Sequence, residues 1–260
     1  MGSLTRRTDF AQALRAGADL VGSFQKTPAY QNVELFARSG VDFVVLDTEH
    51  APFDLAQLDA CIMASHLGDL PLLVRIARNA PDAILPVLDM GATGVLVPHV
   101  ASAEAARRAS EAAHYVGGTR GFSPSGRAGG YGTRGLTPYI EQADREVAVV
   151  LQIEDAAALD HLDAIARTPG IAGLFVGRAD LAVSLNVGWS DPRLDDAVAA
   201  TAKAARAAGV GAGTYLADFG RLADYRRCGA TFFIVGSDQS MMRTEAGRVA
   251  QAFRAAPDKA

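Results

Sequence analysis

Two carboxylates, Glu154 and Asp180, follow successive apolar runs of this 260-residue chain. If those runs are neighbouring parallel strands, the two side chains leave one edge of a sheet from strands about 4.8 Å apart. Bare carboxylates that close repel each other, so they share either a proton or a cation. With no cysteine nearby, an oxygen-only site suits Mg²⁺ or Mn²⁺ better than structural zinc. The alternative is a pair of solvated or ion-paired acids.

Three more polar residues are expected at the same edge. Arg75 ends an apolar run, and its planar fork could bind a substrate carboxylate through two hydrogen bonds. The alternative for this arginine is an ion pair with Asp47 or Glu49. His50 could act as a general base near neutral pH, or could simply be exposed to solvent. Gln152 lies two residues before the first carboxylate, so strand alternation puts both on one face, where it could bind a metal-associated water or fill a polar layer.

Eight short apolar runs carry these residues, and longer Ala-rich amphipathic stretches separate them. Continuous apolar strands that alternate with helices indicate a parallel sheet covered on both faces. Eight such units in about 250 residues favour a closed (β/α)₈ barrel, which places its chemistry at the carboxyl ends of the strands. An open doubly wound sheet is the alternative, although no G-x-G-x-x-G fingerprint follows the first run. The predicted strands are Leu20–Phe24, Phe43–Leu46, Leu72–Ile76, Gly94–Val97, Val147–Ile153, Ile171–Val176, Gly211–Tyr215 and Phe232–Val235.

One segment interrupts the alternation of strands and helices. Residues 117–135 are too rich in glycine for a helix and too long for a plain turn, so they could form a lid or phosphate cradle, or a rim or subunit contact. No linker, low-complexity tract or repeat divides the chain, so residues 1–260 are predicted to form one domain. A C-terminal helix, Gln239–Phe253, is expected to serve in subunit contacts. The other predicted helices include Leu55–His66, Ala103–Tyr115, Ala156–Arg167 and Asp195–Ala208.

Composition argues against several other classes of protein. Hydrophobic residues make up 49% and charged residues 21% of the chain, as in ordinary globular enzymes. A net charge of −4 predicts no cationic surface for nucleic acid or for an anionic membrane. Cys61 and Cys228 form no Cys-x-x-Cys pattern, which favours a reduced, cytoplasmic protein. Residues 1–18 lack the apolar region of a signal peptide, and no apolar run approaches the ~20 residues of a membrane span.

Six motifs, in order, resemble those of the HpcH/HpaI family of class II, metal-dependent pyruvate aldolases, in the phosphoenolpyruvate/pyruvate barrel superfamily. The motifs span most of the chain, and an ordered set of six is far more specific than any single one. They are LDTEHAPFD (Leu46–Asp54), LVRIARN (Leu73–Asn79), LDMGATGVLVPHV (Leu88–Val100), RGFSPSGRAGGYG (Arg120–Gly132), VLQIED (Val150–Asp155) and FVGRADLAVSLN (Phe175–Asn186).

The resemblance assigns roles to the residues at the rim. Glu154 and Asp180 match the ligands of one divalent cation, which would be Mg²⁺, Mn²⁺ or Co²⁺, with no organic cofactor. Arg75 matches the arginine that binds the carboxylate of a 2-keto acid and polarises its keto oxygen. Gln152 matches a residue that lines metal and substrate. His50 matches the catalytic base, which acts through a water.

The resemblance also implies contacts from the surrounding backbone and aromatic residues. Backbone amides of Gly177 and Ala179 would cradle the substrate carboxylate, and Phe24 occupies an aromatic position beside the pocket. Where the family commonly has Gly-Pro-Ala-Asp, this chain has Arg178 in place of proline. Proline would fix φ at that turn, whereas arginine adds length and positive charge near the metal. His99, after the fourth run, could also line the mouth of the barrel.

Asp89 matches an acid that pairs with the base histidine in the family. The pattern places it at the end of a helix that precedes the fourth strand, which is the bottom of its own barrel. It can reach a site at the carboxyl ends only from a neighbouring subunit, as in the hexamers of the family. The resemblance therefore predicts a homohexamer, and the alternative is a surface acid at the end of a helix.

The implied activity is that of an aldolase acting on a small 2-keto acid and an aldehyde. It would form the enolate of pyruvate or of a relative such as hydroxypyruvate and add it reversibly to the aldehyde. No lysine is expected at a suitable strand end, which argues against a Schiff-base aldolase. The chain has only Lys26, Lys203 and Lys259.

Two other functions remain open at this point. One is a related lyase or decarboxylase on the same scaffold, including a CoA-ester lyase like the β-type relatives of citrate lyase. Arg120, Arg127 and Arg134 of the 117–135 segment could hold the phosphates of CoA. The other is a non-catalytic barrel that serves as a sensor or assembly scaffold.

Overall fold

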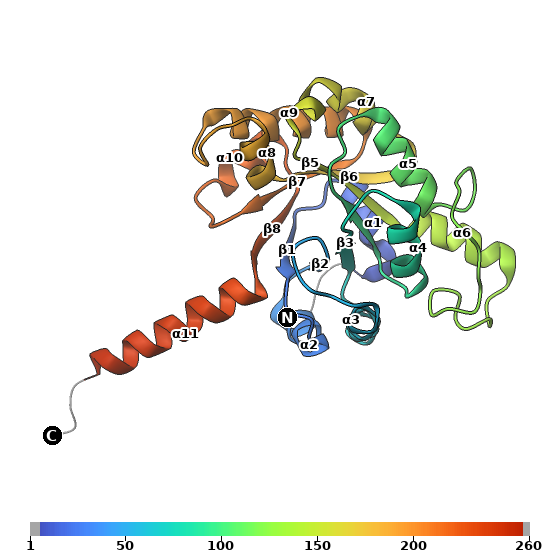
Figure 1. Ribbon diagram of the computed structural model, residues 1–260, viewed down its shortest axis with the longest axis horizontal. Helices are drawn as coiled ribbons and strands as arrows, with labels where there is room; N and C mark the ends of the chain where they lie inside the picture. The colour runs from blue at the N-terminus through green and yellow to red at the C-terminus, as the bar shows by residue number, and fades with distance from the viewer. Residues whose placement is uncertain (1–5, 257–260) are drawn as a thin grey trace.

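Eight parallel strands close into a barrel in the computed structural model, which describes residues 6–256 (Figure 1). Each strand pairs with the next in chain order, and β8 pairs back with β1. All eight predicted strands are present, so the prediction of a closed barrel is confirmed and the open sheet is excluded. The strands are β1 Leu20–Gln25, β2 Phe43–Asp47, β3 Leu72–Arg75, β4 Gly94–Val97, β5 Ala148–Ile153, β6 Ile171–Val176, β7 Gly211–Leu216 and β8 Phe232–Ser237.

Aromatic side chains fill the barrel interior near the amino-terminal ends of the strands. Phe43 and Phe232 are buried there, and Phe10 of α1 packs against Phe43 with ring centroids 5.2 Å apart. Gly22 and Gly213 make room for these rings, because a Cβ at either position would lie within 2.6 Å of the nearest ring atom. This filled core closes that part of the barrel interior, so the interior is open to a ligand toward the carboxyl ends of the strands, where a barrel carries its chemistry.

The helices cover the outside of the barrel and pack on a second apolar layer of the strands (Figure 1). Side chains of Asp54, Ser102 and Asp191 accept hydrogen bonds from backbone amides at the starts of α3, α5 and α9, which satisfies donors that a helix cannot pair internally. The helices are η1 Arg7–Asp9, α1 Phe10–Arg15, α2 Tyr30–Ser39, α3 Leu55–Leu67, α4 Pro81–Asp89, α5 Ala103–Ala113, α6 Leu136–Glu146, η2 Ala156–His161, α7 Leu162–Ala166, α8 Arg178–Ser184, α9 Pro192–Ala208, α10 Leu222–Cys228 and α11 Asp238–Ala255.

The 117–135 segment contains no helix or strand and lies at the amino-terminal end of the barrel. The backbone N–H of Ala128 donates to the carbonyl of Asp89. Arg127 donates to the carboxylate of Asp59 at 2.6 Å and to the carbonyl of Met90 at 2.8 Å. The turn after α4, which precedes β4, therefore anchors the segment. The segment therefore lies at the end of its own barrel opposite the carboxyl ends of the strands, and the predictions of a lid, a phosphate cradle, a rim or a subunit contact concern that end.

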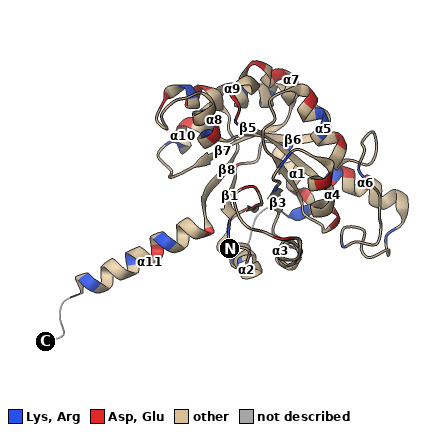
Figure 2. Ribbon diagram, viewed as in Figure 1, with Lys and Arg blue, Asp and Glu red and all other residues tan. Residues whose placement is uncertain are grey.

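The last helix, α11, projects away from the barrel (Figures 1 and 2). Asp238 alone among its residues is buried. This carboxylate accepts hydrogen bonds from the backbone amides of Lys26 and Thr27 and from Asn32, at 2.9 to 3.0 Å, and so ties the start of α11 to the loop after β1. Farther out, Phe253 is 83% exposed. The helix therefore leaves apolar side chains uncovered by its own barrel.

Two further expectations concern the chain as a whole. Cys61 and Cys228 are both free thiols. Within residues 6–256, no helix has the length and hydropathy needed to cross a membrane. Three predictions fall partly or wholly outside the described residues. They are the ends of the predicted domain 1–260, the first part of the 1–18 stretch, and Lys259.

Candidate active site

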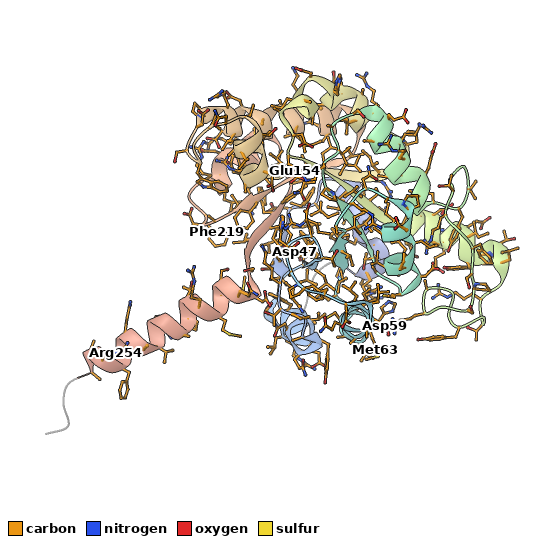
Figure 3. All side chains as sticks on the ribbon, viewed as in Figure 1. Asp47, Asp59, Met63, Glu154, Phe219 and Arg254 are labelled. Carbon is orange, nitrogen blue, oxygen red and sulfur yellow. The ribbon has the colours of Figure 1, made fainter. Side chains whose placement is uncertain are left out.

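A cavity of about 300 Å³ opens at the carboxyl ends of the strands. Figure 3 labels Asp47 and Glu154 within the body of the barrel, far from Arg254 on the projecting helix. The structure brings most of the predicted site residues to this mouth cavity. Those that line it are Phe24, His50, Arg75, Gln152, Gly177, Ala179 and Asp180.

Glu154 lies directly after β5 beside the mouth cavity, and only 1% of it is exposed. It accepts hydrogen bonds from the backbone N–H of His99 at 2.8 Å and from the side-chain amide of Gln152. The contact with Gln152 agrees with the predicted placement of both on one face of the strand. Burial raises the pKa of Glu154 despite these hydrogen bonds, because a low-dielectric environment disfavours the ionised form.

The second predicted metal ligand comes from the neighbouring unit of the barrel. Asp180 stands in the first turn of α8, which follows β6, and β6 pairs with β5 through Ile153 and Val176. Between the two acids lies Gly177. A Cβ there would come within 2.7 Å of Glu154 Oε2 and 2.8 Å of the Gln152 amide nitrogen. Only a glycine leaves the carboxylate open toward α8.

The residues present fit a divalent cation held by oxygen atoms. Gln152 Oε1 and Glu49 Oε2 are buried and have no hydrogen-bond partner. Within the described part of the chain, no group of three or more His, Cys, Asp or Glu side chains is spaced to hold a metal ion. The carboxylates of Glu154 and Asp180 are the groups that would hold such a cation, and water and substrate would fill the further coordination positions, as Mg²⁺ sites commonly allow.

His99 lies within a cluster of carboxylates at this site. Its ring nitrogens lie 3.6 Å from Glu154, 3.3 Å from Asp155 and 3.7 Å from Glu49. Partial burial opposes the imidazolium, but the carboxylates outweigh it and raise the pKa of His99. Its backbone adopts a φ of +53°, which is uncommon for a residue other than glycine. In the sequence, only the position of His99 directly after a buried strand and a proline indicated a place in the site.

Arg75 makes the ion pair that was the alternative to substrate binding. Its Nε and Nη2 donate to the two oxygens of Asp47 at 3.0 and 2.7 Å, and Nε lies 3.5 Å from Glu49. Burial acts to raise the pKa of Asp47, but its bonds from Arg75 prevail and lower it. Arg75 Nη1 has no hydrogen-bond partner among the described residues. The guanidinium also packs 4.8 Å from the centre of the Phe24 ring, so the ion pair fixes the arginine in the wall of the mouth cavity.

Lys26 corrects one of the predictions. It directly follows β1 and lines the mouth cavity, so the statement that no lysine stands at a suitable strand end is wrong. The rule that identified the other rim residues would have found it, had β1 been extended to Gln25. Its Nζ lies 3.2 Å from Asp47 Oδ2, and an ammonium paired with a carboxylate is a poor nucleophile for a Schiff base.

His50 lies exposed at the edge of the mouth cavity. Its Nε2 is 3.8 Å from Glu49, and its backbone N–H donates to Asp47 at 3.2 Å. The ring therefore has access both to the cavity and to solvent, which a base that works through a water requires.

Comparison with known proteins places this site in a family. The sequence model described as HpcH/HpaI aldolase/citrate lyase matches residues 22–244. The chain belongs to the HpcH/HpaI aldolase/citrate lyase family. It is an enzyme of the lyase class, of the aldolase type.

Relatives in this family match nearly the whole chain. The 5-keto-4-deoxy-D-glucarate aldolase of Escherichia fergusonii is 35% identical over 248 residues, which are 94% of this chain and 96% of that protein. An HpcH/HpaI family protein from Burkholderia cenocepacia has a TM-score of 0.89 at 29% identity, with 95% of this chain and 100% of that chain covered. The citrate synthase SbnG has a TM-score of 0.83 at 28% identity, with 94% and 97% covered.

Asp89 does not join the HpcH/HpaI site of its own barrel. It is the last residue of α4, at the amino-terminal end, and its carboxylate accepts a hydrogen bond from Arg120 at 2.9 Å. Arg120, Arg127 and Arg134 line a cavity at this same end. These arginines therefore lie at the end of the barrel opposite the mouth cavity.

Arg178, which replaces the family proline, is buried and directed toward neighbouring helices. It donates to Asp195 of α9 at 2.5 Å, to the hydroxyl of Tyr225 of α10 and to the carbonyl of Trp189 at 3.3 Å. Arg178 lines the mouth cavity, as a positive charge near the metal site would require, and this charge is paired with Asp195. Trp189, which Arg178 contacts, also lines the mouth cavity. No pattern in the sequence predicted this, because Trp189 lies in a loop.

Proposed function

We propose that this enzyme forms the enolate of pyruvate or a related 2-keto acid and adds it reversibly to an aldehyde that carries a carboxylate. The observation that carries the proposal is the convergence of Arg75, Gln152, Glu154 and the α8 turn on one mouth cavity. Glu154 and Asp180 would hold a divalent cation, Mg²⁺, Mn²⁺ or Co²⁺. Such a cation supplies Lewis-acid stabilisation of the charge that develops on the keto oxygen.

The side chains around the cavity divide the remaining work. Asp47 holds Arg75 through two hydrogen bonds and leaves Nη1 for the keto acid, an arrangement that fixes the guanidinium before substrate binds. The backbone N–H of Ala179, in the first turn of α8, would receive its carboxylate, whereas the predicted contribution of Gly177 is wrong because its N–H donates to the carbonyl of Ile153 at 3.0 Å. His50, at the rim, takes the proton from the carbon next to the keto group, through a water.

Lys26 supports the choice of an acidic aldehyde. It lines the mouth cavity, pairs with Asp47 and is partly exposed. The relatives named 5-keto-4-deoxy-D-glucarate aldolase act on a sugar acid with a carboxylate at each end, as the word glucarate denotes. A second carboxylate on the substrate would pair with Lys26 while the first stays with the α8 turn.

Asp89 and α11 support an assembly of several subunits, and we assign a homohexamer. Asp89 serves the family's site only from a neighbouring barrel, and α11 carries uncovered apolar side chains that include Met242 and Phe253. Aromatic and methionine side chains are typical of the centre of subunit interfaces. The location that composition and the two free thiols support is the cytoplasm.

Exchange of the methyl protons of pyruvate for deuterium tests the proposed reaction without an aldehyde. Wild-type protein supplied with Mg²⁺ or Mn²⁺ should catalyse exchange seen by NMR, and stripping with EDTA should abolish it reversibly. Glu154→Gln should lower the rate by at least about 100-fold, since it removes a charge aimed at the cation. The matched control is Glu34→Gln on the exposed face of α2. Undiminished exchange after metal stripping would refute the proposal.

A further inference from the structure

A second cavity, called here the basal cavity, lies at the amino-terminal end of the barrel. It encloses about 330 Å³, and two of its residues, Thr93 and Val147, immediately precede β4 and β5. Its walls come from η1, the turn after α4, the 117–135 segment and α6. The residues that matter below are Arg7, His66, Arg120, Arg127, Arg134 and Glu146.

Four arginines line the basal cavity and four carboxylates lie in or beside it, but only Arg120 and Arg127 of these arginines have a direct carboxylate partner. Each acid in or beside it has an arginine of its own within 4 Å. These pairs are Arg120–Asp89, Arg127–Asp59, Arg6–Asp69 and Arg145–Glu146. Figure 3 labels Asp59 on α3, at the side of the barrel where the 117–135 segment packs. Two cavity arginines, Arg7 and Arg134, remain without a carboxylate partner in the described chain.

Arg7 is the more buried of these two arginines. Its guanidinium contacts only uncharged groups, which are Ser65 Oγ at 2.5 Å, the carbonyl of Gly91 at 2.6 Å and His66 Nε2 at 2.8 Å. Removal from water lowers the pKa of Arg7 to about 10. A buried cation without a direct ion-pair partner costs free energy. Asp69 and Glu146 favour the charged form of Arg7 only from beyond ion-pair distance, and an anion in contact with the guanidinium would recover more of that cost.

Two further groups face the basal cavity with unused hydrogen-bonding capacity. Only 3% of the Arg120 side chain is exposed, yet its Nε has no hydrogen-bond partner. Arg134 makes one long contact, 3.4 Å, with Gln142. The positive charge also acts on His66, whose pKa is lowered to about 4 by shielding from water and by Arg7, Arg127 and Arg134.

We propose that the basal cavity binds a phosphate group, either as inorganic phosphate or as part of a small phosphate ester. Arg7 and Arg134 supply two unpaired positive charges, and Arg120 Nε supplies a buried donor. Arginine forks match the geometry of phosphate oxygens, and a dianion would neutralise both free charges. The cavity is large enough for a phosphate together with a small organic group.

Calorimetric titration at constant ionic strength tests the basal cavity in the wild-type full-length chain, with inorganic phosphate and with glycerol phosphate as separate probes. We expect saturable binding of one anion per chain, with the tighter probe showing which source fits better. Arg7→Gln and Arg134→Gln should each weaken binding by about 10-fold or more, the effect of losing one charged hydrogen-bond donor. Arg107→Gln, an exposed arginine of α5, serves as the charge-matched control and should bind as wild type does.

NMR titration of His66 provides a second readout that does not depend on heat signals. Bound phosphate should raise the pKa of this imidazole, because it offsets the three nearby arginines. Arg134 is exposed, so its variant tests the site even if Arg7→Gln fails to fold. Absence of saturation with either phosphate probe, binding of malonate in preference to phosphate, or equal weakening by Arg107→Gln would overturn the proposal.

Discussion

At the scale of single residues, Asp47 organises the mouth cavity. Its carboxylate accepts two hydrogen bonds from Arg75 and lies 3.2 Å from the ammonium of Lys26. The lowered pKa of Asp47 keeps it ionised, so one anion fixes two cations relative to each other. A substrate with a carboxylate at each end can be distinguished from one with a single carboxylate by this fixed separation.

Replacement of Lys26 by methionine should weaken the preference of the enzyme for an aldehyde that carries a carboxylate. The ratio of kcat/KM for a carboxylate-bearing aldehyde to that for a neutral aldehyde of similar size should fall about 10-fold or more, because a charged hydrogen bond contributes about 1.5–3 kcal/mol. Steady-state kinetics with pyruvate and the two aldehydes measures the ratio. Lys203→Met, at an exposed position of α9, is the control. An equal decrease in kcat/KM with both aldehydes would show that Lys26 does not bind the second carboxylate.

At the scale of elements, Arg178 joins three helices behind the site. It begins α8 and donates to Asp195 of α9 and to Tyr225 of α10, and Tyr225 also donates to Asp195 at 2.6 Å. Burial acts to raise the pKa of Asp195, but hydrogen bonds from Tyr225 and Arg178 prevail and lower it. The turn that carries Asp180 is therefore held by an ion pair where family members commonly rely on proline.

Asp195→Asn should destabilise this helix cluster in a pH-dependent way. At pH 7 the free energy of unfolding should fall by about 2 kcal/mol, less than for a fully buried pair because Asp195 is partly exposed. A carboxyl with a lowered folded pKa stabilises above its ordinary value, near 4, and loses that contribution as pH falls through the folded pKa. Urea unfolding of both proteins between pH 7 and pH 3 should therefore show the difference shrinking at the acid end.

The exposed neighbour Asp196 provides the control for this experiment. Asp196→Asn should change the free energy of unfolding by no more than about 0.5 kcal/mol, as surface substitutions usually do. A difference between wild type and Asp195→Asn that stays constant from pH 7 to pH 3 would contradict the assigned role of the carboxylate.

The strands were predictable from sequence because strands buried on both faces read as continuous apolar runs. Where the local pattern is mixed, prediction was less accurate. Residues 156–167 read as one helix, but they form the 3₁₀ turn η2 followed by the short helix α7. The start of α6 at Leu136, directly after the glycine-rich segment, was not predicted. Periodicity identifies an element better than it identifies its ends.

The candidate site was predictable in part for the same reason. A barrel brings the carboxyl ends of its strands together, so any polar residue directly after an apolar run is a candidate. Contacts between distant segments carry no such local signal. The pairs of Arg178 with Asp195 and of Asp89 with Arg120 depend on how helices and loops pack, and Trp189 reaches the cavity from an irregular loop.

At the scale of the whole molecule, the two ends of the barrel carry different sets of charged residues. The mouth cavity holds the acids and Arg75, whereas Asp89 and the basal cavity lie at the other end. The long helix α11 extends away from both (Figure 1). The catalytic role proposed for Asp89 requires that subunits associate so that each lends Asp89 to the mouth cavity of a neighbour.

Mixing two inactive variants should restore activity if Asp89 acts across subunits. Asp89→Asn and Glu154→Gln, unfolded together and refolded as hybrids, form some sites with both native side chains. Random association gives such sites at one half times one half, or about one quarter of the total. Aldol cleavage by the hybrids should approach that fraction of wild-type activity, whereas each variant refolded alone stays inactive. Hybrids proven by mass measurement that show no recovery would place Asp89 outside the neighbour's site.

The seam between β8 and β1 has a consequence for how the chain folds. Leu20 pairs with Phe232, so this pairing closes a loop of 232 − 20 = 212 residues, the longest of any strand pair in the barrel. Loop-closure entropy therefore opposes this pairing most strongly. An open seam would expose two unpaired strand edges, which recruit foreign strands and promote aggregation. Asp238 stabilises the closed seam through its hydrogen bonds to the loop after β1. These bonds therefore support the strand pairing whose loop closure costs the most entropy.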